Sequence, residues 1–314
     1  LFTGSEILVA GGTLRFEGTA AAPVVLRRGV NTTQVPSIGV GSNLLATVGT
    51  AGSITASHVD SVISIGGGQS AVLTIRDSSF HRAAPIDWNS DTDSLYQVPK
   101  VATRGTSVIL DNCSFHNAIA EFADTVFRVT GCDFDNSRLN VIRFPIAQPA
   151  VIDGNTFRNS PVVAPLELDG YDVRLGAGNV FVNNFAPVSL RGAGLTPDSI
   201  VPATGNMHNR VFLTGALQAL DIVGPMTLPP MSVPYRLWAG MIEGEQYDPR
   251  VRCLPGTIVE MDPDTYLSFR GGARFEVLGT PEAPVQFVQA SPGQPWLTFQ
   301  TNSSPPLRVR NAIF

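Results

Sequence analysis

The sequence predicts an all-β fold of the right-handed parallel β-helix class, a solenoid with coils of about 19–26 residues. Three observations support this prediction. An aromatic motif recurs at the length of one coil, a tight turn of small polar residues precedes each copy, and the apolar runs lack a convincing 3.6-residue period. The third observation predicts almost no helix.

The recurring motif is Phe-x-Asn. From Phe115 onward, successive copies are 19, 23, 24 and 26 residues apart. The last of these, which starts at Met207, is degenerate, and Phe80 begins an earlier copy without its asparagine. Because strand side chains alternate, the phenylalanines should form an inward ladder, and the asparagines should stack and hydrogen-bond at turns. The complete copies pair Phe115 with Asn117, Phe134 with Asn136, Phe157 with Asn159 and Phe181 with Asn183.

An aliphatic strand and a tight turn precede each copy. The turns lie at 75–78, 110–113, 129–132, 152–155 and, one residue longer, 175–179. A single coil of this length cannot bury its own apolar side, so coils should stack about 4.8 Å apart and bury one another. Crossovers between parallel strands are almost always right-handed, which sets the expected hand.

A longer repeat lies over the coils. Residues 8–26 read LVAGGTLRFEGTAAAPVVL, and residues 267–287 read LSFRGGARFEVLGTPEAPVQF. The copies share a Gly-Gly, an apolar strand, a Gly-Thr and a late Pro-Val. We therefore expect a first β-helix module over 1–224, incomplete at its N-terminal side. Residues 225–314 should form a proline-rich junction and the opening coils of a second module, stacked on the first.

These elements resemble the opening coils of bacterial right-handed β-helix repeat proteins that are secreted or displayed on cell surfaces. The Pro-Gly-Thr at 255–257, the Gly-Gly pairs and the Gly-Thr-x-x-x-Pro elements carry the resemblance, and Trp296 fits the tryptophan strand that often follows them. They cover roughly a sixth of the chain, or about two thirds with the Phe-x-Asn coils. The resemblance implies the fold and an extracellular or cell-surface location, and it says little about activity.

The composition excludes several classes of function. Lys100 is the only lysine and no basic run occurs, so nucleic-acid binding is not expected. The apolar runs are shorter than the roughly 18–20 residues of a membrane span. Charged residues make up 15% and hydrophobic residues 43%, which allows a large core. The arginine-dominated basic residues, with abundant alanine, valine and glycine, suggest a bacterial source with a GC-rich genome.

The best metal candidate is a set of oxygen ligands at alternate positions: Asp87, Asn89, Asp91 and Asp93. Such spacing is typical of calcium loops. The set lies within the 35 residues that separate Phe80 from Phe115. It lacks the glycine at position six and the glutamate at position twelve, so a solvated polar loop is the alternative. Calcium is therefore the one candidate cofactor.

Histidines follow three of the ladder positions, at His81, His116 and His208. By alternation they should point outward, so His81, His116 and Asp135 should align on successive coils. Two histidines and a carboxylate can bind a transition metal. The alternative is a wet polar surface.

The three cysteines have no zinc spacing and form no disulfide framework. Cys113 and Cys132 each precede a ladder phenylalanine by two residues, so both should point inward on adjacent coils, within disulfide range. A pair of small buried thiols is the alternative. Cys253 should be a lone structural residue.

No catalytic set is found, so enzymatic activity is not expected. The chain contains no Asp-Asp and no His-Gly, and Arg143-Phe144-Pro145 has no second arginine at the proper spacing. No nucleophile, base and orienting group occur together. A carbohydrate-active or carbohydrate-binding β-helix, using acidic and aromatic residues of the 81–107 insertion, is the second interpretation.

The first interpretation is an extracellular structural or adhesive module. Uncapped coils at its ends would favour end-to-end association with further copies of the module, and a contact that does not close gives a fibre. An extracellular polysaccharide is the other partner considered. A phage or secretion-system spike is a third interpretation, which would need a trimer and a tip domain.

Overall fold

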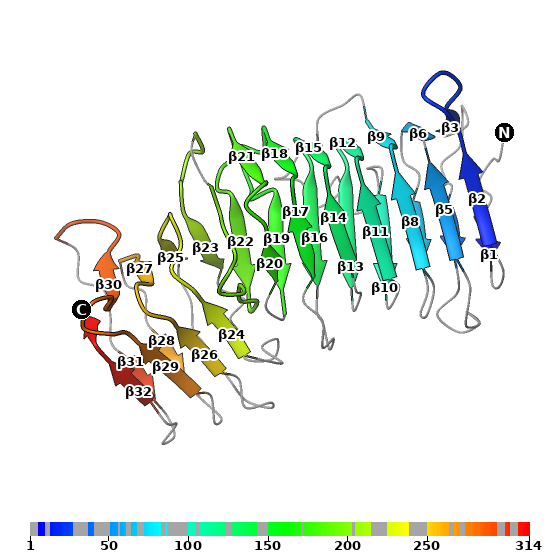
Figure 1. The fold of residues 1–314 in the computed structure, drawn as a ribbon. Coiled ribbons are helices and arrows are strands. Elements are labelled where there is room, and N and C mark those ends of the chain that lie inside the picture. The colour runs from blue at the N-terminus through cyan, green and yellow to red at the C-terminus, as the bar shows by residue number, and fades with distance from the viewer. Residues whose placement is uncertain are drawn as a thin grey trace.

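The computed structural model is all-β (Figure 1). The residues that it describes contain strands and turns but no helix, which confirms the all-β part of the prediction. All pairings between these strands are parallel. The described ranges are 6–9, 13–27, 37–40, 51–55, 57–60, 64–67, 72–82, 86, 100–104, 107–123, 127–142, 150–170, 173–202, 205–214, 225–238, 250–263, 267–269, 274–293, 299–301 and 307–314.

The longest sheet, sheet 1, has 13 strands and runs along the whole molecule. In spatial order its strands are β1 (Glu6–Val9), β4 (Ser37–Val40), β7 (Ser64–Gly67), β10 (Lys100–Arg104), β13 (Ile119–Ala123), β16 (Arg138–Ile142), β19 (Leu166–Asp169), β22 (Val188–Arg191), β23 (Val211–Thr214), β25 (Tyr235–Trp238), β27 (Ile258–Met261), β30 (Val285–Gln289) and β33 (Ala312–Ile313).

Two seven-stranded sheets accompany the first part of sheet 1. Sheet 2 contains β2 (Thr13–Glu17), β5 (Ala51–Thr55), β8 (Val72–Arg76), β11 (Ser107–Asp111), β14 (Phe127–Thr130), β17 (Val151–Asp153) and β20 (Arg174–Leu175). Sheet 3 contains β3 (Val24–Arg27), β6 (Ser57–Asp60), β9 (Ser79–His81), β12 (Ser114–His116), β15 (Asp133–Asp135), β18 (Thr156–Arg158) and β21 (Val180–Val182).

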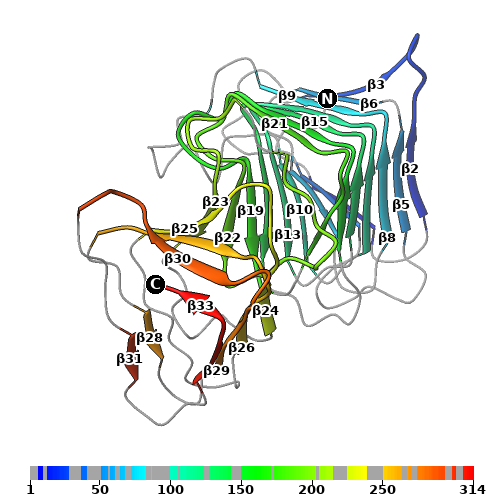
Figure 2. The same cartoon turned by 60° about the vertical axis from the view of Figure 1, so that its left-hand side comes forward.

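From β1 to β21 the chain visits sheets 1, 2 and 3 in turn, and every third strand returns to the same sheet one position further along. Figure 2 shows these successive circuits lying one behind another. The register keeps equivalent residues together: Phe115 lies between Phe80 and Phe134, although 35 residues separate it from Phe80 in the chain. The long interval before Phe115 therefore adds residues to one circuit without shifting the motif.

The predicted phenylalanine ladder is confirmed. Ring centroids of neighbouring members are 4.7–4.9 Å apart, and the planes differ by 4–9°. Each ring is at most 1% exposed. This spacing equals the distance between neighbouring strands, so the rings stack at the pitch that the backbone imposes. The members are Phe80, Phe115, Phe134, Phe157 and Phe181.

The predicted extension of the ladder to Met207 is wrong, because that side chain is 66% exposed. Sheet 3 ends at β21, and the chain between β22 and β23 adds no strand to it. Instead, the neighbouring Asn206 turns inward, and its Nδ2 donates to the carbonyl oxygen of Phe181 at 3.0 Å. With the asparagine facing inward, Met207 faces solvent.

Sheets 2 and 3 stop near residue 182, whereas sheet 1 continues through β33. A new four-stranded sheet, sheet 4, forms beside it from β24 (Pro225–Leu228), β26 (Arg250–Cys253), β29 (Arg274–Leu278) and β32 (Leu307–Arg310). A fifth sheet pairs β28 (Leu267–Phe269) with β31 (Phe299–Thr301). Figure 1 shows sheet 4 at the C-terminal end of the molecule.

The two copies of the longer repeat form the same turn. Ala22 donates its backbone N–H to Thr19 Oγ1 at 3.0 Å, and Ala283 donates to Thr280 Oγ1 at 3.0 Å. The strands after these turns nevertheless join different sheets, since β3 lies in sheet 3 and β30 lies in sheet 1. The second copy is thus shifted by one sheet relative to the first.

The described residues contain no helix that is long and apolar enough to cross a membrane.

Candidate functional sites

The candidate calcium ligands Asp87, Asn89, Asp91 and Asp93 lie outside the described residues, so the calcium loop stays a prediction. Within the described ranges, no three histidine, cysteine, aspartate or glutamate side chains gather closely enough to hold a metal ion.

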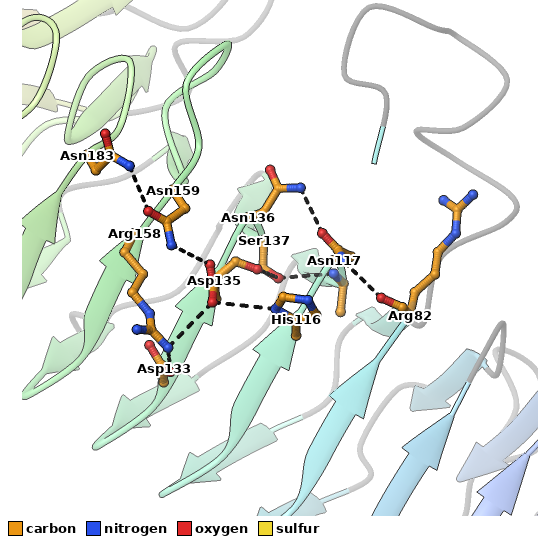
Figure 3. A network of polar contacts seen from close by, with 11 residues as sticks. Arg82, His116, Asn117, Asp133, Asp135, Asn136, Ser137, Arg158, Asn159 and Asn183 are labelled. Atoms are coloured by element: carbon orange, nitrogen blue, oxygen red, sulfur yellow. Dashed lines mark hydrogen bonds and ion pairs between the residues drawn. The ribbon is translucent and has the colours of Figure 1, made fainter. Parts of the chain in front are cut away.

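The predicted outward column on sheet 3 is aligned as expected. His81 pairs in register with His116, and His116 pairs with Asp135. The two imidazole rings stack with centroids 5.1 Å apart, and His116 Nδ1 lies 3.5 Å from Asp135 Oδ2. Figure 3 shows this polar network around His116 and Asp135.

Both oxygens of the Asp135 carboxylate have protein partners. Asn159 Nδ2 donates to Oδ1 at 2.7 Å, and Arg158 Nη2 lies 3.5 Å from Oδ2 (Figure 3). The same guanidinium donates to Asp133 at 2.7 Å. A carboxylate that is held by a cation and an amide has little capacity left for a metal, so the geometry favours a polar surface column that ties successive turns together.

The motif asparagines form a second column at the end of sheet 3. Asn117, Asn136, Asn159 and Asn183 all have a positive φ, between 44° and 60°. Asparagine tolerates this left-handed conformation better than most residues do. Asn136 Nδ2 donates to Asn117 Oδ1 at 2.7 Å, and Asn183 Nδ2 donates to Asn159 Oδ1 at 2.8 Å (Figure 3). The predicted stacking at the turns is confirmed.

A buried polar column lies at the corner between sheets 2 and 3, two residues before each ladder phenylalanine. Its central member, Asn155, is 0% exposed. Asn155 Oδ1 accepts from the Cys132 N–H at 2.9 Å, and its own N–H donates to Asn179 Oδ1 at 3.2 Å. Each side chain thus satisfies a backbone group of the preceding circuit, at a corner where no strand ladder does so. The column consists of Ser78, Cys113, Cys132, Asn155 and Asn179.

A second buried column lies at the corner between sheets 3 and 1. Asn184 Oδ1 accepts from the Ser160 N–H at 3.1 Å, and Asn206 Oδ1 accepts from the Asn184 N–H at 3.1 Å. Ser137 Oγ accepts from the Ala118 N–H at 3.0 Å in the same way. The first corner was predicted as a turn, with Cys113 and Cys132 pointing inward, but the hydrogen-bonding role of the two buried columns was not predicted.

The cysteines are buried free thiols. Cys113 and Cys132 are both 2% exposed, and the Cys113 N–H donates to Cys132 Sγ at 3.4 Å. Their inward placement on adjacent circuits is confirmed, and of the two alternatives the structure has the thiol pair. The hydrogen bond with Cys113, together with burial, raises the pKa of the Cys132 thiol. Burial alone raises the pKa of Cys253 to about 12.

We expect the native protein to react slowly with a thiol reagent such as DTNB at pH 8, because burial excludes the reagent from all three thiols and the raised pKa of Cys132 and Cys253 keeps these two protonated. After unfolding in guanidinium, all 3 thiols should react rapidly. An absorbance time course measures both states. Rapid labelling of one or more thiols in the native protein would contradict their burial.

A groove of about 340 Å³ lies on the outer face of sheet 1, across β16, β19, β22 and β23, and we call it the outer groove. On β19, Leu166 and Leu168 are 0% exposed and point inward, so Glu167 points outward into the groove. The segments that lead into β19 and β22 form its wall, through Val162, Ala164, Phe185 and Ala186.

Phe212 lies at one end of the outer groove and is only 3% exposed, although it points away from the main core. It forms a small separate cluster with Ala164, Ala186 and Phe185. The Arg236 guanidinium lies over its ring, 5.9 Å from the centroid. The sheet thus carries an apolar patch on its outer face, which firmly positions the aromatic wall of the groove.

The charged lining of the outer groove has one carboxylate and two guanidinium groups. Arg138 and Glu167 form an ion pair, with side chains 23% and 21% exposed. Burial is the main factor that lowers the pKa of Arg138 to about 10, while Glu121 raises it and Arg191 lowers it. Arg138 therefore remains protonated at neutral pH. Its Nε is buried without a hydrogen-bond partner among the described residues.

His208, the third predicted outward histidine, packs beside the outer groove. Its ring lies edge-on to Phe185 and to Phe212, with centroids 4.9 and 5.7 Å away. Burial lowers the pKa of His208, and the charges of Arg236 and Arg210 lower it further. It does not align with His81 and His116, because sheet 3 ends before residue 208.

The outer groove was not predicted from the sequence. Its charged members Arg138, Glu167 and Arg191 lie on three different circuits and share no motif. Each is an outward residue of a short strand, where a charged side chain is ordinary. Only the register of sheet 1 brings them to one place.

Comparison with known proteins finds no matching family model, no similar curated protein and no similar solved structure.

Proposed function

We propose that this chain is a right-handed parallel β-helix that serves as an extracellular structural or adhesive module and associates end to end with further copies of the same module. The three-sheet circuit supports the solenoid, since each return to a sheet advances by one strand. The right hand follows from the strong general preference of parallel crossovers. The resemblance to bacterial surface-displayed β-helix repeat proteins supports the location.

One observation carries the association. Leu307 and Val309 on β32 are in register with Phe275 and Val277, which are 3% and 0% exposed. They therefore occupy core positions, yet they are 46% and 41% exposed. A further coil from another copy of the module would bury these two side chains, and such burial stabilises by about 25 cal/mol per Å². An edge strand can also pair with a further strand.

The regular columns support a mechanical role over a catalytic one. The stacked rings, the asparagines at the turns and the two buried polar columns all repeat along one axis, which gives a stiff rod whose parts contact only their neighbours. We propose a non-enzymatic role on this basis.

Val309→Asp should weaken assembly, because it places a carboxylate at a core position of β32 that the added coil would bury. We expect the wild-type protein to form concentration-dependent oligomers or fibres, and the variant to stay predominantly monomeric. Analytical ultracentrifugation and negative-stain electron microscopy measure this difference.

Val182→Asp is the matched control, since Val182 is 40% exposed at an outward position of β21 and not at a core position. It should assemble like the wild type. Dispersed single rods of wild-type protein at high concentration would contradict the proposal, and so would equal assembly of Val309→Asp.

A further inference from the structure

The outer groove combines an excess of positive charge with an apolar wall. Arg138 and Arg191 face one carboxylate, that of Glu167. Arg191 is exposed and makes no ion pair or hydrogen bond with another described residue, although it is close enough for its charge to act on Arg138. The lining of the groove therefore has two guanidinium groups and one carboxylate, while the charge of Glu121, outside the lining, also acts on Arg138.

The buried Nε of Arg138 points to a missing acceptor. A buried donor without a partner costs about 1–3 kcal/mol, so such groups are rare unless a water or a ligand satisfies them. Guanidinium groups bind carboxylates in a planar, two-bond geometry better than any other side chain does. A ligand carboxylate in the groove would supply acceptors to Arg191 and to the exposed part of the Arg138 guanidinium, whose side chain is 23% exposed.

The apolar wall of the outer groove fits a small ring. Phe185 is partly exposed beside the charged groups, and Val162, 42% exposed, forms the rim. A volume of about 340 Å³ is at the lower end of the range for small-molecule sites, about 300–1,000 Å³, which favours a ligand of one or two rings. Aromatic faces pack well against the C–H face of a sugar.

The floor favours a hydroxylated ring over a hydrocarbon ring. Glu167 and Ser189 both line the groove and offer oxygen atoms next to the arginines. A hydrocarbon ring would bury these oxygens without hydrogen bonds, at a cost in free energy. The hydroxyls of a sugar can donate to them.

We propose that the outer groove binds a uronic-acid residue, a sugar ring that carries a carboxylate. Arg138 and Arg191 donate to the carboxylate, Phe185 packs against the apolar face of the ring, and Glu167 and Ser189 contact its hydroxyls. The proposal concerns ligand binding only. It is independent of end-to-end assembly, because binding can be measured on the monomeric protein.

Isothermal titration calorimetry with three probes tests the proposal. D-Glucuronate should bind saturably, whereas D-glucose, which lacks the carboxylate, should bind at least tenfold more weakly. Cyclohexanecarboxylate, which lacks the hydroxyls, should also bind more weakly than glucuronate. Equal binding of glucose would overturn carboxylate recognition, and equal binding of cyclohexanecarboxylate would overturn the assignment to a sugar.

The variant Arg191→Ala should weaken glucuronate binding by about 10- to 100-fold, the range for loss of a charged hydrogen bond. Because Arg191 is exposed, its removal should leave the melting temperature unchanged. Arg191→Lys should bind with intermediate affinity, since it keeps the charge but loses the planar fork.

Arg128→Ala is the matched control, because Arg128 is an exposed arginine on β14 of sheet 2, away from the groove. It should bind glucuronate like the wild type. Absence of saturable glucuronate binding by the wild type, or an equal loss in Arg128→Ala and Arg191→Ala, would overturn the proposal.

Discussion

Phe134→Ala is expected to lower the free energy of unfolding by about 3–5 kcal/mol, the usual cost of removing a fully buried phenylalanine ring. Phe134 is 0% exposed, and its ring stacks on Phe115 at 4.7 Å and on Phe157 at 4.8 Å. The substitution leaves a cavity in the middle of the ladder. The backbone spacing of the adjacent strands prevents the two flanking rings from closing it.

Urea denaturation followed by far-ultraviolet circular dichroism measures this loss. Phe134→Leu should cost less than the alanine variant because it fills part of the space, although it removes the ring stacking. Val182→Ala, at an exposed position, should change stability by no more than about 0.5 kcal/mol. If Phe134→Ala costs less than about 1 kcal/mol, the ladder is not a main source of stability.

Asn155→Ala is expected to cost about 2–4 kcal/mol, because it orphans buried backbone groups of neighbouring circuits. Asn155 Nδ2 donates to the carbonyl oxygen of Val129 at 2.9 Å, and Oδ1 accepts from the Cys132 N–H at 2.9 Å. The Cys132 N–H lies at the corner between β14 and β15, so no strand partner can replace the side chain there. Water has no access, since Asn155 is 0% exposed.

Asn112→Gly is the matched control for an asparagine at the same corner. Asn112 Nδ2 donates to Asp77 Oδ1 at 2.6 Å, but this hydrogen bond is exposed. Its φ of 52° suits glycine, and Gly131 and Gly154 already have φ of 65° and 67° at the equivalent positions of the next circuits. Stability should change little. Similar urea midpoints for Asn155→Ala and the wild type would show that the inner column is dispensable.

The ladder and the turns were predictable because both are local patterns that repeat. An apolar ring on every coil must be buried, so the rings meet in one column although the intervals between them range from 19 to 35 residues. The asparagines followed for a similar reason, since a turn with positive φ accepts few residues. The prediction failed at Met207, where sheet 3 had already ended and Asn206 took the inward position.

The amino-acid sequence by itself determined the strands, the circuit length, the Phe80–Phe181 ladder and the inward placement of Cys113 and Cys132. These features depend on the alternation of strand side chains and on the recurrence of the Phe-x-Asn motif, and both operate within one or two coils. Tertiary structure alone decided the shift of the second repeat copy to another sheet, the buried bonding of Asn155, and the meeting of Arg138 with Arg191. Each of these depends on which strands become neighbours across circuits. The strand register decides which residues of different circuits lie side by side, and no short-range pattern in the chain encodes that register.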